Sequence, residues 1–280
     1  MKKGINQWAF PSSISVKEIL ELAHQFGFQG VELCPSAQGE LSFPLTQEKI
    51  SEIRNLAQDF NLEIRSIATD LLWKYNLASS NQNSRKKAKE IVKRLVETAA
   101  NLGAQSVLII PGYVNVPWDS SSEVVPYQEA FYRVQESLKE LAPLAQEAKV
   151  YLAIENVWNK LFLSPLEFCS LIDSIESRWV KAHFDTANVL IAGYPEQWIK
   201  LLGERIITVH IKDFKLSVGN INGFCLPLEG DVNWPQVMQS LQDIGYDDYL
   251  IAEVIPPYSY SKEALLANIS FNLDCLLKMP

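Results

Sequence analysis

The chain alternates between short apolar runs and longer stretches in which apolar residues recur at helical spacing. The helical spacing is clearest over 88–99, where apolar residues recur every three or four positions before Gly103. The short runs are typical of buried strands. These predicted strands are 4–8, 30–33, 62–68, 106–110, 151–155, 181–185, 206–211 and 249–254. The regular alternation predicts parallel strands joined by helices.

Residues that favour helix ends support this assignment. Ser15 with Glu18, and Ser164 with Glu167, have the spacing of capping boxes, in which a hydroxyl and a carboxylate bond backbone N–H groups at a helix start. Residues that tolerate the left-handed conformation of a helix C-cap follow three predicted helices: Gly27, Asn61 and Gly245.

Eight strands in this rhythm favour a single (β/α)₈ TIM barrel over residues 1–280. The length of 280 residues and the 48% hydrophobic content match one such domain. A doubly wound open sheet is the rival fold, but no glycine-rich phosphate motif follows the first predicted strand. We find no internal repeat or linker that would divide the chain.

Four predicted strands have an ionisable residue at their last or next-to-last position: Glu155, Asp185, His210 and Glu253. An unpaired buried charge costs several kcal/mol, so each ending needs a reason. A paired structural charge or a helix cap would explain any one of them. In a barrel, however, all four would meet at the mouth formed by the carboxyl ends of the strands. Three carboxylates and an imidazole suit Mn²⁺, Mg²⁺ or Co²⁺, with Zn²⁺ as a further candidate.

The stretches IENVWNK, FDTANVLIAGYPEQW and VHIKDF resemble the sugar phosphate isomerase/epimerase family, which has a xylose isomerase-like barrel. The resemblance extends over essentially the whole chain and is strongest to L-ribulose- and L-xylulose-5-phosphate 3-epimerases. It implies one divalent metal ion, with Mn²⁺ as the first expectation, held by the four strand-end residues. It also implies a sugar or sugar phosphate substrate, and a homodimer or homotetramer.

The chemistry that this resemblance implies begins with removal of a proton from the carbon beside a carbonyl, which leaves an enediolate. A metal ion would stabilise the developing negative charge as a Lewis acid. Glu155 and Glu253 are the expected catalytic pair, one removing a proton and the other returning one to the opposite face.

The chain departs from the free-ketose 3-epimerases of this family at two positions. Asn188 stands where those enzymes have a histidine, and Leu161 stands where they have a substrate-binding glutamate. The asparagine resembles the phosphosugar branch, which favours a phosphorylated substrate. Lys212 and the following loop, with Lys215, are expected to bind the phosphate, or else to form a solvated basic turn.

Further residues near strand ends are candidates for substrate binding. Trp8 and Trp158 could pack on the apolar face of a sugar, although aromatic residues are also common in a core. Asn156 directly follows Glu155 and could bond a substrate oxygen. Glu32 could bind a sugar hydroxyl or form a structural ion pair.

Two residues are candidates for supporting the metal ligands. His183 precedes Asp185 by two residues and shares its face of the strand, one layer deeper, where a core histidine is the alternative. Asp213 could orient His210 or Lys212. Its alternative is an acidic residue at a helix entry.

The amino-acid composition limits the classes of molecule that the protein is expected to bind. The net charge of −8 argues against nucleic acid, and three histidines are too few for an endonuclease IV-like multi-zinc barrel. No apolar run is long enough to span a membrane, and the start of the chain has no signal-peptide core. The four cysteines lack zinc or redox spacing, as expected for reduced thiols in the cytoplasm.

Two long segments, 111–126 and 213–233, follow predicted strands and should overhang the mouth.

Two alternative functions fit the same four strand-end residues. One is an inosose dehydratase-like lyase that uses the same metal site. The other is a barrel that binds metal and sugar without turnover, although the presence of all four ligand residues argues against it.

Overall fold

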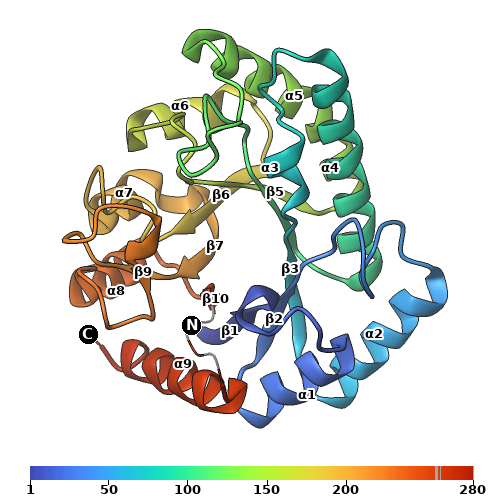
Figure 1. Cartoon of the computed structure of the whole chain (residues 1–280), viewed down its shortest axis with the longest axis vertical. Helices are drawn as coiled ribbons and strands as arrows, with labels where there is room; N and C mark the ends of the chain where they lie inside the picture. The colour runs from blue at the N-terminus through green and yellow to red at the C-terminus, as the bar shows by residue number, and fades with distance from the viewer. Residues whose placement is uncertain (256–257, 259, 280) are drawn as a thin grey trace.

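In the computed structural model, which describes residues 1–255, 258 and 260–279, parallel strands close into a barrel with helices around the outside (Figure 1). The strand order is β1-β10-β7-β6-β5-β4-β3-β2, so the first and last barrel strands pair and close the sheet. The strands are β1 Lys2–Asn6, β2 Gly30–Leu33, β3 Glu63–Ile67, β4 Ser106–Ile109, β5 Tyr151–Glu155, β6 Val180–Asp185, β7 Ile206–Ile211 and β10 Tyr249–Ala252. The predicted TIM barrel is confirmed.

Helices lie between consecutive barrel strands and cover the outside of the sheet (Figure 1). They are α1 Val16–Gln25, α2 Gln47–Asp59, α3 Leu71–Lys74, α4 Gln82–Leu102, α5 Tyr127–Ala148, α6 Pro165–Ser174, α7 Pro195–Leu202, α8 Trp234–Asp243 and α9 Lys262–Leu276. The predicted N-caps are present, since the Ser15 and Ser164 hydroxyls accept the backbone N–H groups of Glu18 and Glu167. The predicted C-cap residues have positive φ: Gly27, Asn61 and Gly245.

The barrel strands fall where the hydrophobic runs predict them. β2, β5 and β7 have the predicted bounds, and the other barrel strands differ by two residues or fewer at each end. β1 ends at Asn6, which places Trp8 in a 3₁₀ turn, Gln7–Ala9, instead of the predicted strand. β10 ends at Ala252, so Glu253 lies just beyond it at the mouth.

Apolar residues fill the space between the barrel and the helices, whereas the barrel interior holds a buried polar layer. Leu20, Phe168 and Phe184 are examples of fully buried core side chains. The polar layer includes side chains that are completely buried: Asn6, Glu32, Ser66, His183 and His210. Because burying polar groups is unfavourable unless they find partners, the contacts of this layer need a specific explanation.

The segment 213–233 contains a short antiparallel pair of strands, β8 Asp213–Phe214 and β9 Phe224–Cys225, before α8 begins. Strand β8 starts two residues after β7 ends, so the whole segment rises from the mouth of the barrel. Within the part of the chain that the structure describes, no helix is both long and apolar enough to cross a membrane.

Candidate metal centre and substrate cavity

Four side chains converge at the mouth of the barrel. Glu155 and Asp185 are the last residues of β5 and β6. His210 is the next-to-last residue of β7, and Glu253 directly follows β10. One ligand atom from each of the four lies within 4.8 Å of those of the other three. The strand ends therefore meet as the sequence predicts, and metal binding by them stays a prediction.

The free atoms of these residues fit a divalent cation. Asp185 Oδ1 accepts the backbone N–H groups of Ala187 and Asn188, at 2.9 and 2.8 Å, which leaves Oδ2 available. Asp185 Oδ2, His210 Nδ1 and Glu253 Oε2 are buried, and their charged contacts are with Lys212 and with one another. Buried ligand atoms that converge in this way are what a divalent cation would bind.

Lys212 places a positive charge beside the same carboxylates. Its Nζ lies 3.2 Å from Asp185 Oδ2, and it forms an ion pair with Glu253 Oε2. The ammonium also lies 5.0 Å from the centre of the Phe224 ring. Burial opposes its ionisation, but Asp185 and Glu253 outweigh burial and hold the pKa of Lys212 well above its usual range. The Lys212 ammonium, which was expected to bind a phosphate, is therefore paired with the candidate metal ligands in this structure.

The two glutamates of the centre differ in protonation. Burial, followed by the charges of Glu253 and Asp185, raises the pKa of Glu155 to about 8. Burial also opposes ionisation of Glu253, but Lys212 and His210 outweigh it and hold the pKa of Glu253 well below its usual range. In the metal-free protein near neutral pH, Glu155 is therefore mostly a carboxylic acid and Glu253 a carboxylate.

Two asparagines line this centre in different ways. Asn188 Nδ2 donates to Glu155 Oε1 at 3.2 Å, and the side chain borders the cavity. Asn156 instead uses both ends of its amide on the backbone of Asp185, with Oδ1 accepting from N–H and Nδ2 donating to the carbonyl, each at 2.8 Å. Asn156 therefore fixes the end of β6, and the substrate contact proposed for it stays a prediction.

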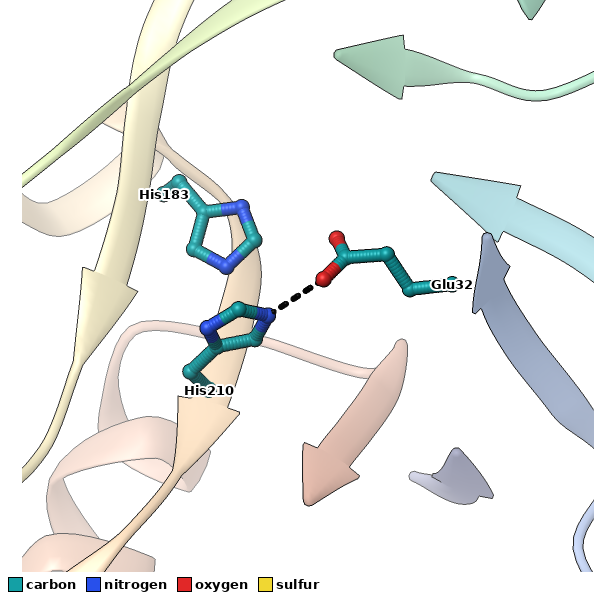
Figure 2. A group of neighbouring side chains, drawn as sticks. All are labelled: Glu32, His183 and His210. Atoms are coloured by element: carbon teal, nitrogen blue, oxygen red, sulfur yellow. Dashed lines mark hydrogen bonds and ion pairs between the residues drawn. The ribbon is translucent and has the colours of Figure 1, made fainter. Parts of the chain in front are cut away.

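Glu32 and His183 lie one layer deeper than the cavity. Glu32 is fully buried, and its Oε1 lies 2.7 Å from His210 Nε2, so of the two roles considered for it the structural ion pair is the one present (Figure 2). His183 lies where predicted, with its ring centre 3.9 Å from that of His210. Burial, followed by the charge of His210, lowers the pKa of His183 to about 3, so its ring is neutral.

A cavity of about 500 Å³ opens above the four residues. Its size suits a monosaccharide or a small sugar derivative. Trp8 and Trp158 border it as predicted, and Trp158 Nε1 donates to the Asn188 carbonyl at 2.8 Å. Both long segments contribute to its wall, with Trp118 from 111–126 and residues from 213–233 that include Lys215, Phe224 and Glu229.

Asp213 organises the segment 213–233 instead of orienting His210 or Lys212 as predicted. Its Oδ1 accepts the backbone N–H groups of Phe214 and Val232, at 2.8 and 3.1 Å. Its Oδ2 accepts the Leu228 N–H at 3.0 Å and the Trp234 indole N–H at 2.9 Å. The carboxylate thus joins both ends of the segment that forms one wall of the cavity.

Sequence reasoning did not single out three groups at the site. Asn6 and Ser66 both donate to the Glu32 carboxylate. Trp73 borders the cavity and packs edge-on against Trp118, with ring centres 5.0 Å apart. Asn6 and Ser66 carried a usable signal, because each is a polar residue in a buried strand.

Comparisons with known proteins agree with this architecture. The family model described as "Xylose isomerase-like TIM barrel" matches residues 20–270. A fructoselysine 3-epimerase from Shigella flexneri is 24% identical over 253 residues, which is 87% of this chain and 88% of that protein.

Two solved structures share the fold at low sequence identity. A D-psicose 3-epimerase crystallised in the presence of D-fructose aligns with a TM-score of 0.82 and 18% identity, over 100% of this chain and 99% of that one. The IOLI protein, solved with a bound zinc atom, aligns with a TM-score of 0.75 and 17% identity, over 99% and 98% of the two chains.

Proposed function

We propose that the chain, which belongs to the xylose isomerase-like TIM barrel family and is similar to a fructoselysine 3-epimerase, is a divalent-metal-dependent epimerase or isomerase of a ketose or ketose phosphate. The observation that carries the proposal is the buried group of Glu155, Asp185, His210 and Glu253 at the floor of a sugar-sized cavity. Mn²⁺ is the first candidate for the ion, and the zinc atom bound in the IOLI protein makes Zn²⁺ the second.

When bound, the cation would supply Lewis acidity to the two substrate oxygens that gain negative charge as the proton leaves. The chain's own groups would move the protons. As a carboxylate, Glu253 can remove the proton beside the carbonyl, and Glu155, after taking a proton from solvent, can return one to the opposite face, with the roles exchanged in the reverse direction. Asn188, bonded to Glu155 Oε1, would hold that carboxyl in place.

The cavity also supports a particular placement for a phosphate. Since Lys212 is engaged with Asp185 and Glu253, the exposed Lys215 is the cation that we assign to a phosphorylated substrate. Trp8 and Trp158 would pack on the apolar face of the sugar ring or chain.

The proposal predicts exchange of a substrate proton with solvent. Protein loaded with Mn²⁺ is incubated with ketoses and their phosphates in D₂O, and the products are read by NMR after the metal is removed. Deuterium at carbon 3 with a new epimer identifies an epimerase, and deuterium at carbon 2 of an aldose product identifies an isomerase. Glu155→Gln and Glu253→Gln should each slow turnover by about 10²-fold or more, since each removes a proton-transfer group.

The matched control is Glu97→Gln, which neutralises an exposed glutamate on α4 and should leave turnover unchanged. Loss of water from the substrate without epimer formation would point to the lyase instead. Absence of exchange with every sugar, in protein that has bound its metal, would contradict the proposed function.

A further inference from the structure

The buried contact between Glu32 and His210 crosses the interior of the barrel between strands that are not neighbours. Glu32 reaches from β2 to the imidazole on β7, and the two residues are 178 positions apart in the chain (Figure 2). Both side chains are fully buried. Neither Glu32 nor its contact is needed by the proton transfers proposed above, so its presence in the barrel interior calls for another explanation.

Two neighbouring strands hold the Glu32 carboxylate in place. Asn6 of β1 and Ser66 of β3 are the register partners of Glu32, one on each side. The Asn6 amide donates to Oε1, and the Ser66 hydroxyl donates to Oε2. With both oxygens engaged, the carboxylate has little freedom to rotate away from His210.

This arrangement decides which nitrogen of His210 carries a proton. A carboxylate only accepts hydrogen bonds, so the contact of 2.7 Å requires an N–H at His210 Nε2. In a neutral imidazole, Nδ1 then carries the lone pair. Nδ1 is also the nitrogen that faces the metal centre, 3.3 Å from Glu253 Oε2. The His183 ring packs at 80° to the His210 ring and limits its rotation.

We propose that Glu32 is the positioning residue that holds His210 in its Nε2–H form, so that Nδ1 is the atom offered to the divalent cation. This inference rests on the proposed function, because it concerns the same metal centre. Carboxylates that accept the second N–H of a metal-binding histidine fix its orientation and increase its basicity, and their loss typically weakens metal binding by about 10–100-fold.

A second cation between Glu32, His183 and His210 is the competing explanation, since atoms of these residues also lie within 4.8 Å of one another. The hydrogen bonds favour the positioning role. Glu32 Oε1 already contacts His210 and Asn6, and a cation between Glu32 and His210 would have to replace the existing contact.

The test compares Glu32→Leu, which removes the acceptor, with Glu32→Gln, which retains a carbonyl oxygen. Isothermal titration with Mn²⁺ should show about 10–100-fold weaker binding for Glu32→Leu and a smaller loss for Glu32→Gln. The control is Ser106→Ala, which removes a buried barrel hydroxyl that bonds Thr208 Oγ1 and not Glu32, and it should leave the Mn²⁺ affinity unchanged. A folded Glu32→Leu variant that binds Mn²⁺ with wild-type affinity would overturn the inference. A wild-type chain that binds two Mn²⁺ ions, with only one bound by Glu32→Leu, would also overturn it.

A second readout uses the wild-type protein alone and is independent of how the variants fold. ¹⁵N NMR of the Zn²⁺-loaded protein has only three histidines to assign. The inference predicts that His210 Nε2 bears the proton and Nδ1 binds the metal. Metal binding at His210 Nε2, with the proton on Nδ1, would overturn the inference about Glu32 but would still be consistent with the proposed metal centre. A His210 signal that does not respond to Zn²⁺ would instead count against the proposed function itself.

Discussion

At the scale of single residues, the candidate metal centre keeps two glutamates in different protonation states. Glu155 is shielded from water and close to other carboxylates, and its pKa is raised to about 8. Glu253 is paired with Lys212 and His210, and its pKa lies well below the usual range. This difference identifies Glu155 as the carboxyl group of the metal-free centre that must lose a proton when a cation binds.

These protonation states predict that metal affinity rises with pH. Below about pH 8, the cation must displace the proton of Glu155. It must also displace a proton from His210, because Glu32 and Glu253 outweigh burial and raise the pKa of His210 well above its usual value. The dissociation constant should fall by roughly tenfold per pH unit for each proton displaced between pH 6 and 8. His183, with a pKa of about 3, contributes nothing in this window.

Isothermal titration with Mn²⁺ at pH 6, 7 and 8 measures this dependence. Repeating each titration in two buffers of different ionisation enthalpy counts the protons released. An affinity that does not change between pH 6 and 8 would show that Glu155 and His210 do not lose protons on binding.

The sequence predicted the residues of the centre but not all of their contacts. Glu155, Asp185, His210 and Glu253 could be found because parallel strands end at one mouth, so ionisable strand ends must meet. The role of Glu32 could not, since its partner lies across the barrel and the local register shifts between Val31 and Glu32.

At the scale of elements, the segment 213–233 depends on one carboxylate. Asp213 accepts four hydrogen bonds from within the segment and from the start of α8. From the sequence, Asp213 could be interpreted as a group that orients His210 or Lys212 or as an acidic residue at a helix entry, because nothing local to it shows that β8 and β9 turn the chain back over this side chain. Helix and strand positions were easier to predict, because they follow from local periodicity.

Replacing Asp213 with Asn should loosen this wall of the cavity. An amide group cannot accept the two hydrogen bonds that one carboxylate oxygen now accepts, so buried donors lose their partner. We expect the free energy of unfolding to fall by about 1–3 kcal/mol and the amides of 214–232 to exchange faster with solvent. Chemical denaturation and hydrogen exchange followed by mass spectrometry measure the two effects.

Gly230→Ala should weaken the same segment, because an added Cβ would lie 2.3 Å from Asp213 Oδ1 and 2.6 Å from the Phe214 nitrogen. The control is Ser217→Ala, an exposed change in the same segment. Unchanged exchange in both Asp213→Asn and Gly230→Ala would mean that these contacts do not hold the segment in place.

At the scale of the whole molecule, closure of the barrel brings distant parts of the sequence to one centre. Strand β1 pairs with β10, so the last ligand residue, Glu253, is held beside the first strand of the chain. The sequence could predict that the barrel closes, because eight strand–helix units joined by crossover connections of the same handedness favour a closed barrel. It could not predict the register of each strand pair, which sets the layer at which each inward side chain lies.

We propose that one divalent cation binds between Glu155, Asp185, His210 and Glu253. An anomalous difference map tests this binding, from crystals grown with Mn²⁺ and data collected above and below the manganese absorption edge. We expect one strong peak per chain, within bonding distance of all four residues and near Nδ1 of His210. A peak between Glu32, His183 and His210, a peak elsewhere, or no peak at saturating Mn²⁺ would contradict it.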